Sequence, residues 1–376
     1  MWELPWQGKR VPHAVLDIMR GCNISCRACY NSQPSSPPKP LEEIESELDQ
    51  LLRFRHLSSV SIVGGEVTLH PQLCEIIQLV RSKDLEVELV TNGLLIDQEY
   101  LNNLASAGLT IIYFHVEKGQ DRPDLPVNHS YEQINELRRQ KALMSAEAGI
   151  EVGLTLTVYP EEKEELHNTL DLMFRSPQIN YLLVTLYRDI SLINILKGNI
   201  FSGMSGEGSP PRYPSQMHIK DIVSSLKNDL HMEPFGFVGS NVDRTDPRWL
   251  SYLVAVNTQS SGAYNYQSLQ ASPLEKSMMF LLRLFRIRYP MFIEQNAERF
   301  RKHLFLNGML TGRYLQHQAL IKESKLADRT LRAKRILFQN PAELREDGTL
   351  IHCQCCPDAI IKNGSLVPVC IADKVV

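Results

Sequence analysis

The feature that most constrains this fold is a regular alternation of strand-like and helix-like segments in the first half of the chain. Six short apolar or alternating segments are separated by five longer segments whose apolar residues recur at helical spacing. The strand-like segments are Ala14–Met19, Ser58–Val63, Leu85–Val90, Thr110–Val116, Glu151–Val158 and Tyr181–Tyr187, and the helical ones are Leu41–Phe54, Pro71–Arg81, Ile96–Ala107, His129–Ala148 and Glu161–Arg175. Strict alternation predicts a parallel sheet, and six such strands predict an α/β fold of the partial (β/α)6 barrel type.

The remaining chain divides by composition. Residues 1–195 contain the predicted barrel, and residues 196–216 form a loop or linker rich in Gly and Pro. Residues 217–345 are predicted to be mainly helical and to cover the barrel. Residues 346–376 form a small Cys-rich extension with a predicted hairpin.

Composition excludes several classes of protein. The net charge of −3 over 376 residues gives no electrostatic support for a general nucleic-acid binder. No apolar stretch is long enough for a transmembrane segment, and the most apolar segment is interrupted by Arg283 and Arg286. The first residues do not read as a signal peptide, so we expect a cytoplasmic location, where thiols stay reduced.

Seven of the eight cysteines fall into two groups. Cys22, Cys26 and Cys29 directly follow the first strand-like segment, and Cys353, Cys355, Cys356 and Cys370 lie near the C-terminus. In a reducing compartment, such clusters indicate metal ligands. Three thiolates on one loop leave one iron of a cubane iron–sulfur cluster open to another ligand, while the alternative is an incomplete zinc knuckle.

The first group carries a family resemblance. Cys-x3-Cys-x2-Cys followed by Tyr30, in the loop after the first strand, resembles the motif of the radical S-adenosylmethionine (SAM) superfamily. Two further motifs occur in the expected order, each at the end of a predicted strand. They are Gly64-Gly65-Glu66, which resembles the family's GGE motif, and Thr91-Asn92-Gly93.

The resemblance implies a set of cofactors and site residues. Cys22, Cys26 and Cys29 would hold a [4Fe-4S] cluster whose open iron binds SAM. Gly64, Gly65 and Glu66 would contact the methionyl amino group of SAM, with Thr91, Asn92 and Gly93 at the next strand end. The glycines lack side chains and allow close backbone approach, and Glu66 supplies a negative charge.

His115 and Glu117 end the fourth predicted strand. Alternation along the strand places both side chains on one face. They are candidates for binding SAM or substrate, and a structural polar pair is the alternative.

The C-terminal cysteines predict a second metal site. Asn363-Gly364 between two β-prone runs predicts a two-residue hairpin turn, which places Cys370 opposite Pro357 and therefore beside Cys356. Cys353, Cys355, Cys356 and Cys370, with His352 able to replace one of them, suit a second iron–sulfur cluster or a zinc ion. We favour the cluster because radical SAM enzymes often carry one.

By this resemblance, the chain is an enzyme that reductively cleaves SAM to a 5′-deoxyadenosyl radical, which abstracts hydrogen from a substrate. The substrate is a peptide, a sugar or nucleoside, or a lipid precursor, and a ferredoxin or flavodoxin is the expected electron donor. The alternative is a non-enzymatic iron–sulfur redox sensor or a metal-stapled binding module. The GGE and TNG motifs argue against that alternative, because a pure sensor has no need for a SAM site.

Overall fold

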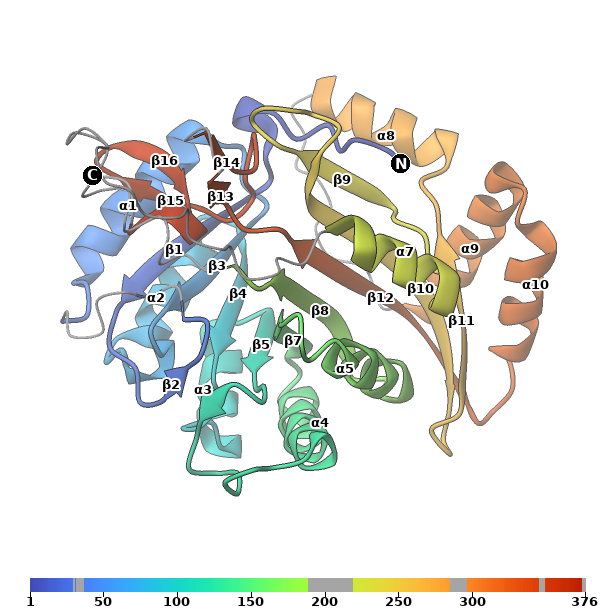
Figure 1. The fold of residues 1–376 in the computed structure, drawn as a ribbon, viewed down its shortest axis with the longest axis horizontal. Helices are drawn as coiled ribbons and strands as arrows, with labels where there is room; N and C mark the ends of the chain where they lie inside the picture. Colours follow the sequence, from blue (N-terminus) through green and yellow to red (C-terminus); the bar gives the residue numbers. More distant parts are fainter. Residues whose placement is uncertain (30, 32–36, 189–218, 285–295, 345–348, 374–376) are drawn as a thin grey trace, which may run out of the picture.

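The barrel predicted from the sequence is present in the structure, a computed structural model that describes residues 1–29, 31, 37–188, 219–284, 296–344 and 349–373 (Figure 1). Its six strands pair in parallel in the order in which they occur along the chain. They are β1 (His13–Met19), β3 (Ser59–Gly64), β4 (Glu86–Thr91), β5 (Ile111–His115), β7 (Glu151–Val158) and β8 (Ile179–Leu186). The predicted fold class is confirmed for this half of the chain.

A helix occupies each of the five gaps between these strands. The helices are α1 (Leu41–Phe54), α2 (Leu73–Ser82), α3 (Gln98–Ala107), α4 (Tyr131–Glu147) and α5 (Glu164–Arg175). In α1, acidic Glu42 and Glu43 suit the helix N-terminus, and Ile44 and Leu48 are fully buried against the sheet. The acidic residues at the start of α1 and its apolar face therefore both predict this helix.

The prediction that residues 217–345 are mainly helical needs correction. The described part of this region contains α7 (Ile219–Leu230), α8 (Pro273–Leu284), α9 (Ala297–Thr311) and α10 (Tyr314–Glu323). It also contains β9 (Gly236–Gly239), β10 (Pro247–Gln259), β11 (Tyr264–Leu269), β12 (Arg329–Gln339) and β13 (Glu343–Leu344). The predicted linker at 196–216 lies outside the described residues.

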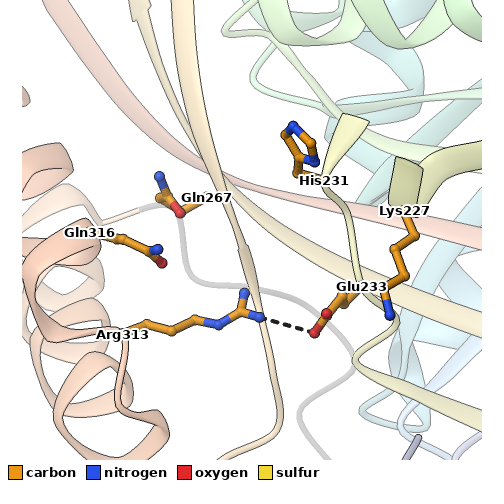
Figure 2. Close-up of a pocket in the computed structure, with 6 residues that line it drawn as sticks. All are labelled: Lys227, His231, Glu233, Gln267, Arg313 and Gln316. Atoms are coloured by element: carbon orange, nitrogen blue, oxygen red, sulfur yellow. Dashed lines mark hydrogen bonds and ion pairs between the residues drawn. The ribbon is translucent and has the colours of Figure 1, made fainter. Parts of the chain in front are cut away.

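These added strands extend the barrel sheet rather than cover it. β12 pairs in parallel with β8 and antiparallel with β10, and β11 forms the far edge beside β10. Helices α9 and α10 pack on one face of this extension, through Phe300, Leu304 and Leu320 (Figure 1). A hollow beside β11 is lined by polar side chains (Figure 2).

Charged residues obscured strand β12 in the sequence. Lys334 is fully buried within it, and its Nζ donates to the carbonyls of Ser176 and Ile179 at 2.7 Å each. Burial lowers the pKa of Lys334 well below its usual value. The amino group caps the carbonyl of Ser176 at the end of α5 and that of Ile179 at the start of β8, so a residue typical of solvent lies in the core.

The C-terminal hairpin is confirmed in its predicted register. β15 (Ala359–Lys362) pairs with β16 (Ser365–Pro368), with Ala359 opposite Pro368, after the short pair of β13 with β14 (Leu350–Ile351). Asn363 and Gly364 form the turn with positive φ values of 49° and 72°. The hairpin lies against β1, the edge strand of the barrel, where Ile360 and Val367 share a core cluster with Val15 (Figure 1).

None of the helices in the described ranges combines the length and apolar character that a bilayer crossing requires.

Candidate functional site

The first cysteine group lies on the loop that leaves the C-terminal end of β1. Within it, β2 (Ser25–Cys26) pairs with β6 (Gln120–Asp121), so that Cys26 stands opposite Gln120. The Gln120 amide donates to Cys26 Sγ at 3.6 Å. Cys22 and Cys29 are exposed, whereas Cys26 is half-buried. The loop therefore offers two thiols to solvent and fixes the third against the chain that follows β5.

The thiols of this loop influence one another. Burial, Glu117 and Cys29 raise the pKa of Cys26 to about 12. Burial also raises the pKa of Cys29, with a smaller contribution from Cys22. Thiolates this close repel, and positive metal ions remove that cost, so the donor set fits the implied cluster. In the described residues, no three Cys, His, Asp or Glu side chains already stand at metal-binding distances, so the fit is one of donor type and placement.

Gly64 and Gly65 let the end of β3 pack against the start of the cysteine loop. A Cβ at Gly64 would lie 2.3 Å from the Met19 carbonyl oxygen, and one at Gly65 would lie 2.0 Å from the Gly21 carbonyl oxygen. Gly65 N donates to the Met19 carbonyl at 2.8 Å, and Glu66 N donates to the Gly21 carbonyl at 2.7 Å. Both positions thus require glycine to seat the cysteine loop, apart from any contact with a ligand.

The Glu66 carboxylate joins the ends of β3 and β4. It is buried, and its Oε1 accepts from Thr68 N at 3.0 Å, from Thr68 Oγ1 at 2.6 Å and from Thr91 Oγ1 at 2.5 Å. Its Oε2 accepts from Asn92 N at 2.7 Å. Since Oε2 accepts from a single donor among the described residues, it retains capacity for a second hydrogen bond.

Asn92 connects the end of β4 to two other strand ends. Its side-chain amide donates to Asn23 Oδ1 in the cysteine loop at 2.7 Å, and its carbonyl accepts from Arg122 after β5 at 3.1 Å. Gly93 follows with a φ of +74°, and a Cβ there would lie 2.8 Å from the ring of Phe114. The three predicted motifs are therefore joined by direct contacts.

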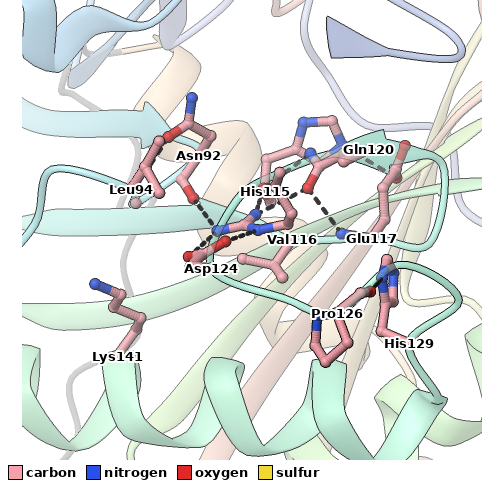
Figure 3. A network of polar contacts seen from close by, with 12 residues as sticks. Asn92, Leu94, His115, Val116, Glu117, Gln120, Asp124, Pro126, His129 and Lys141 are labelled. Atoms are coloured by element: carbon pink, nitrogen blue, oxygen red, sulfur yellow. Dashed lines mark hydrogen bonds and ion pairs between the residues drawn. The ribbon is translucent and has the colours of Figure 1, made fainter. Parts of the chain in front are cut away.

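His115 and Glu117 also come together, as predicted from strand alternation (Figure 3). His115 Nε2 lies 3.0 Å from Glu117 Oε2, and Thr157 N donates to the same oxygen at 2.7 Å. Burial acts to raise the pKa of Glu117, but His115 and the Thr157 N–H hold it below its usual value. Glu117 is buried and His115 is 26% exposed, so His115 is the solvent-accessible member of the pair.

Arg122 was not predicted, yet it organises this edge of the barrel, where Figure 3 labels its partners Asn92, Gln120 and Asp124. Its side chain is fully buried and makes paired bonds to Asp124 at 2.6 and 2.8 Å. It also donates to Gln120 Oε1 at 2.9 Å. The available signal was a charged residue in the loop after the fourth predicted strand. Asn23 and Gln120 were also missed, because polar residues are common in loops and give no signal of their own.

The C-terminal cysteines form a second, more buried group. Cys353 is 9% exposed, in an apolar cluster with Trp6 and Trp249 in which Cys355 and Cys356 also pack. A hydrogen bond with Cys353, together with burial, raises the pKa of Cys356 well above its usual value. Burial and the neighbouring Cys356 raise the pKa of Cys370 to about 12. The predicted return of Cys370 to the other cysteines is thus seen.

Arg55 fixes this second group to the start of β1. Its guanidinium is buried and donates to the carbonyls of His13 at 2.6 Å, Pro357 at 3.0 Å and Cys356 at 2.7 Å. The Cys-rich loop is therefore held at the N-terminal end of β1, whereas Cys22–Cys29 follows the C-terminal end. The chain then continues past the hairpin to Asp373, which pairs with Arg20 at 3.0 Å, beside the first cysteine loop.

Comparison with known proteins agrees with the motifs. Residues 16–173 match the model of the radical SAM superfamily. Residues 16–173 are therefore a radical SAM domain. The matched range includes the first cysteine group, the GGE and TNG motifs and the His115–Glu117 pair.

Curated relatives match this chain over part of their length. Fe-coproporphyrin III synthase of Methanosarcina barkeri is 25% identical over 182 residues, 45% of this chain and 43% of that protein. The subtilosin biosynthesis protein AlbA of Bacillus subtilis is 31% identical over 102 residues, 27% of this chain and 22% of that protein. The tungsten-containing aldehyde ferredoxin oxidoreductase cofactor-modifying protein of Pyrococcus furiosus is 27% identical over 108 residues, 28% of this chain and 30% of that protein. The chain thus spans less than half the length of each.

Solved structures are similar at low identity. Streptococcus suis SuiB bound to S-adenosylmethionine is 15% identical, with a TM-score of 0.42 over 59% of this chain and 49% of that one. The protein anSMEcpe with bound AdoMet is 18% identical, with a TM-score of 0.40 over 58% of each chain.

Proposed function

We propose that this chain is a radical SAM enzyme that abstracts hydrogen from a substrate carbon. When bound, a [4Fe-4S] cluster and SAM supply the chemistry, in which one electron cleaves the sulfonium S–C5′ bond and gives a 5′-deoxyadenosyl radical. The observation that carries the proposal is the contact of three motifs at successive strand ends, through Glu66, Asn92 and Asn23. A redox sensor on the same barrel gains nothing from this arrangement.

The chain's own residues would hold and orient these groups. Cys22, Cys26 and Cys29 would ligate the cluster, with Gln120 donating to the Cys26 sulfur. Glu66 Oε2 has room for one more donor, which suits the methionyl ammonium of SAM. Thr91 and Asn92 donate to that carboxylate, and Gly93 N donates to Thr91 Oγ1. His115, oriented by buried Glu117, would face SAM or substrate at the same edge.

A second iron–sulfur cluster is our proposal for Cys353, Cys355, Cys356 and Cys370, with zinc as the alternative. Burial and neighbouring thiols raise the pKa values of Cys356 and Cys370, which supports a site where a metal would stabilise the thiolates. The apolar walls from Trp6 and Trp249 suit a site shielded from solvent.

The same chemistry supports proposals for the substrate, the electron donor and the cellular compartment. We propose a peptide, sugar, nucleoside or lipid precursor as substrate and a ferredoxin or flavodoxin as electron donor. The eight unpaired cysteines fit a reducing compartment, so we place the protein in the cytoplasm.

The test is the formation of 5′-deoxyadenosine. Anaerobically reconstituted protein, reduced with dithionite and given SAM, is expected to release 5′-deoxyadenosine even without substrate. Cys26→Ala is expected to abolish this product, whereas Cys74→Ala, on helix α2, retains it. An iron-loaded wild-type protein that binds SAM but yields none of the product would favour the redox-sensor alternative.

A further inference from the structure

Strand β11 leaves one side of the sheet without a partner strand. It pairs with β10, and no other strand in the described ranges pairs along its outer side. Gln259 N donates to the Ala263 carbonyl at 2.7 Å, which marks a hydrogen-bonded pair at the start of the hairpin. Because such pairs alternate along an antiparallel ladder, Tyr264, Tyr266 and Ser268 direct their N–H and C=O groups away from β10.

An independent contact agrees with this direction. Arg313 Nη1 donates to the Ser268 carbonyl at 3.1 Å, so this oxygen faces outward rather than toward β10. The tyrosine side chains are held on one face of the strand, where the Tyr266 hydroxyl donates to the Leu230 carbonyl at 2.7 Å. The edge is therefore ordered, with its main-chain groups at Tyr264 and Tyr266 directed outward.

A hollow of about 310 Å³ lies along this edge, and Figure 2 shows its walls. One wall carries Gln267 of β11 with Arg313 and Gln316 at the start of α10, and the other carries Lys227 of α7 with His231 and Glu233 just after it. The hollow thus straddles the edge of the sheet, with a helix on each side.

The hollow contains one ion pair, and its other four polar side chains have no side-chain partner among the described residues. Arg313 and Glu233 pair with each other at 3.0 Å and are mutually neutralised. Lys227 and His231 make no hydrogen bond or ion pair to any other described side chain, and neither do the amides of Gln267 and Gln316. The available groups are therefore one ammonium, one imidazole and two amides, which together suit a carboxylate.

We propose that β11 and this hollow form a docking site for an extended peptide segment that carries an acidic side chain. The segment adds a strand outside β11 and pairs with the main-chain groups of Tyr264 and Tyr266. Its carboxylate enters the hollow beside Lys227 and His231. The site is separate from the cysteine loops, so the proposal goes beyond the chemistry proposed above and does not depend on it.

The test measures binding of blocked synthetic peptides to the full chain. The probe has seven residues, alternating threonine and valine, with a central glutamate. Two companion probes carry a central glutamine, or N-methyl groups on the amides that would face β11. We expect saturable binding of the glutamate probe at up to about 1 mM, with hydrogen-exchange protection confined to the segment 264–269. The other two probes are expected to bind more weakly.

A matched pair of variants tests the charge. Lys227→Glu is expected to weaken binding of the glutamate probe by about fivefold or more, because repulsion replaces attraction, and to leave the glutamine probe unchanged. Lys220→Glu makes the same charge change on the same helix two turns away and is expected to have little effect.

Four outcomes would overturn the proposal. Equal binding of the N-methylated probe would exclude strand pairing, and equal binding by Lys227→Glu would exclude recognition of the carboxylate. Protection of residues 264–269 that rises with protein concentration, without any peptide, would assign the edge to a second copy of this chain. Absence of binding at about 1 mM would exclude peptides of this class.

Discussion

The two cysteine groups lie at opposite ends of the same strand and differ in almost every physical respect. Cys22–Cys29 sits on an exposed loop after Met19, joined by polar contacts to the chain at the ends of β3, β4 and β5. The C-terminal group packs among tryptophans and is tied to His13 at the start of β1 by Arg55. An exposed loop with polar support suits a site that exchanges a ligand, whereas a dry, packed loop suits a site that keeps its metal.

The largest expected effect is a loss of activity at the first cysteine group with little change in the stability of the fold. Replacing Cys22, Cys26 and Cys29 by Ala is expected to lower 5′-deoxyadenosine formation by more than about a thousandfold, as for residues that act as one catalytic unit. The melting temperature is expected to change little, because two of the thiols are exposed. Anaerobic activity assays and thermal melts check both statements. A large loss of stability would contradict the proposed difference between the two cysteine groups.

Substitution of Arg55 tests the second cysteine group, at the N-terminal end of β1. Arg55→Leu is expected to lower the free energy of unfolding by about 3 kcal/mol, because buried carbonyls lose their charged donor. It is also expected to reduce metal retention at the second group while leaving the first loaded. Arg53→Leu, on the exposed side of α1, is expected to stay within about 0.5 kcal/mol of wild type. Urea titration under anaerobic conditions measures both, and equal effects would refute the role of Arg55.

Glu88 gives a pH test of the barrel interior between the two groups. Burial raises the pKa of Glu88 from 4.5 to about 7, while Ser61, which donates to it at 3.0 Å, acts to lower it. Because the folded state favours the protonated carboxyl, Glu88 costs the protein stability as the pH rises from about 4.5 through about 7. Above that range, Glu88→Gln is expected to be more stable than wild type by up to about 3 kcal/mol.

The comparison of the two proteins isolates Glu88. Burial and Arg55 lower the pKa of nearby His13 to about 3, which opposes the trend in acid, but His13 is present in both proteins. Unfolding titrations from pH 4 to 9 measure the difference. Glu99→Gln, exposed on α3, is the control and is expected to show no such trend. A constant difference between wild type and Glu88→Gln across this range would contradict the assignment.

The smallest expected effect concerns SAM affinity. Glu66→Gln replaces one acceptor oxygen by an NH2 group that faces the donors of Thr68, Thr91 or Asn92. We expect SAM to bind about tenfold more weakly to the reconstituted protein, through loss of a charge-assisted acceptor. Glu75→Gln, exposed on α2, is the control. Titration calorimetry measures both, and unchanged affinity in Glu66→Gln would remove Glu66 from the SAM site.

Local pattern predicted most of the barrel. Helix α1 (Leu41–Phe54) and strand β7 (Glu151–Val158) have the predicted bounds, because their periodicity and end signals are clear. The hairpin at Asn363-Gly364 was predicted in register, since that dipeptide selects one turn type. The candidate site followed because each motif marks a strand end, and parallel strands end at one edge.

Contacts between residues far apart in the sequence could not be predicted from local sequence pattern. Arg55 bonds to Pro357, 302 residues away, and nothing near Arg55 indicates that partner. Strand β12 contains the fully buried Lys334 and the half-buried Arg335, so its alternation was hidden by charges that tertiary contacts satisfy. The same holds for Arg122, whose partners assemble only when β4 and β5 are side by side.

The most direct test of the account is the metal content of each cysteine group. Iron, acid-labile sulfide and zinc would be measured per chain on anaerobically purified protein, beside the variant with Cys22, Cys26 and Cys29 replaced by Ala. The account predicts about eight irons in the wild type and about four in the variant, at four irons for each cubane cluster. A protein that holds zinc and no iron would contradict it.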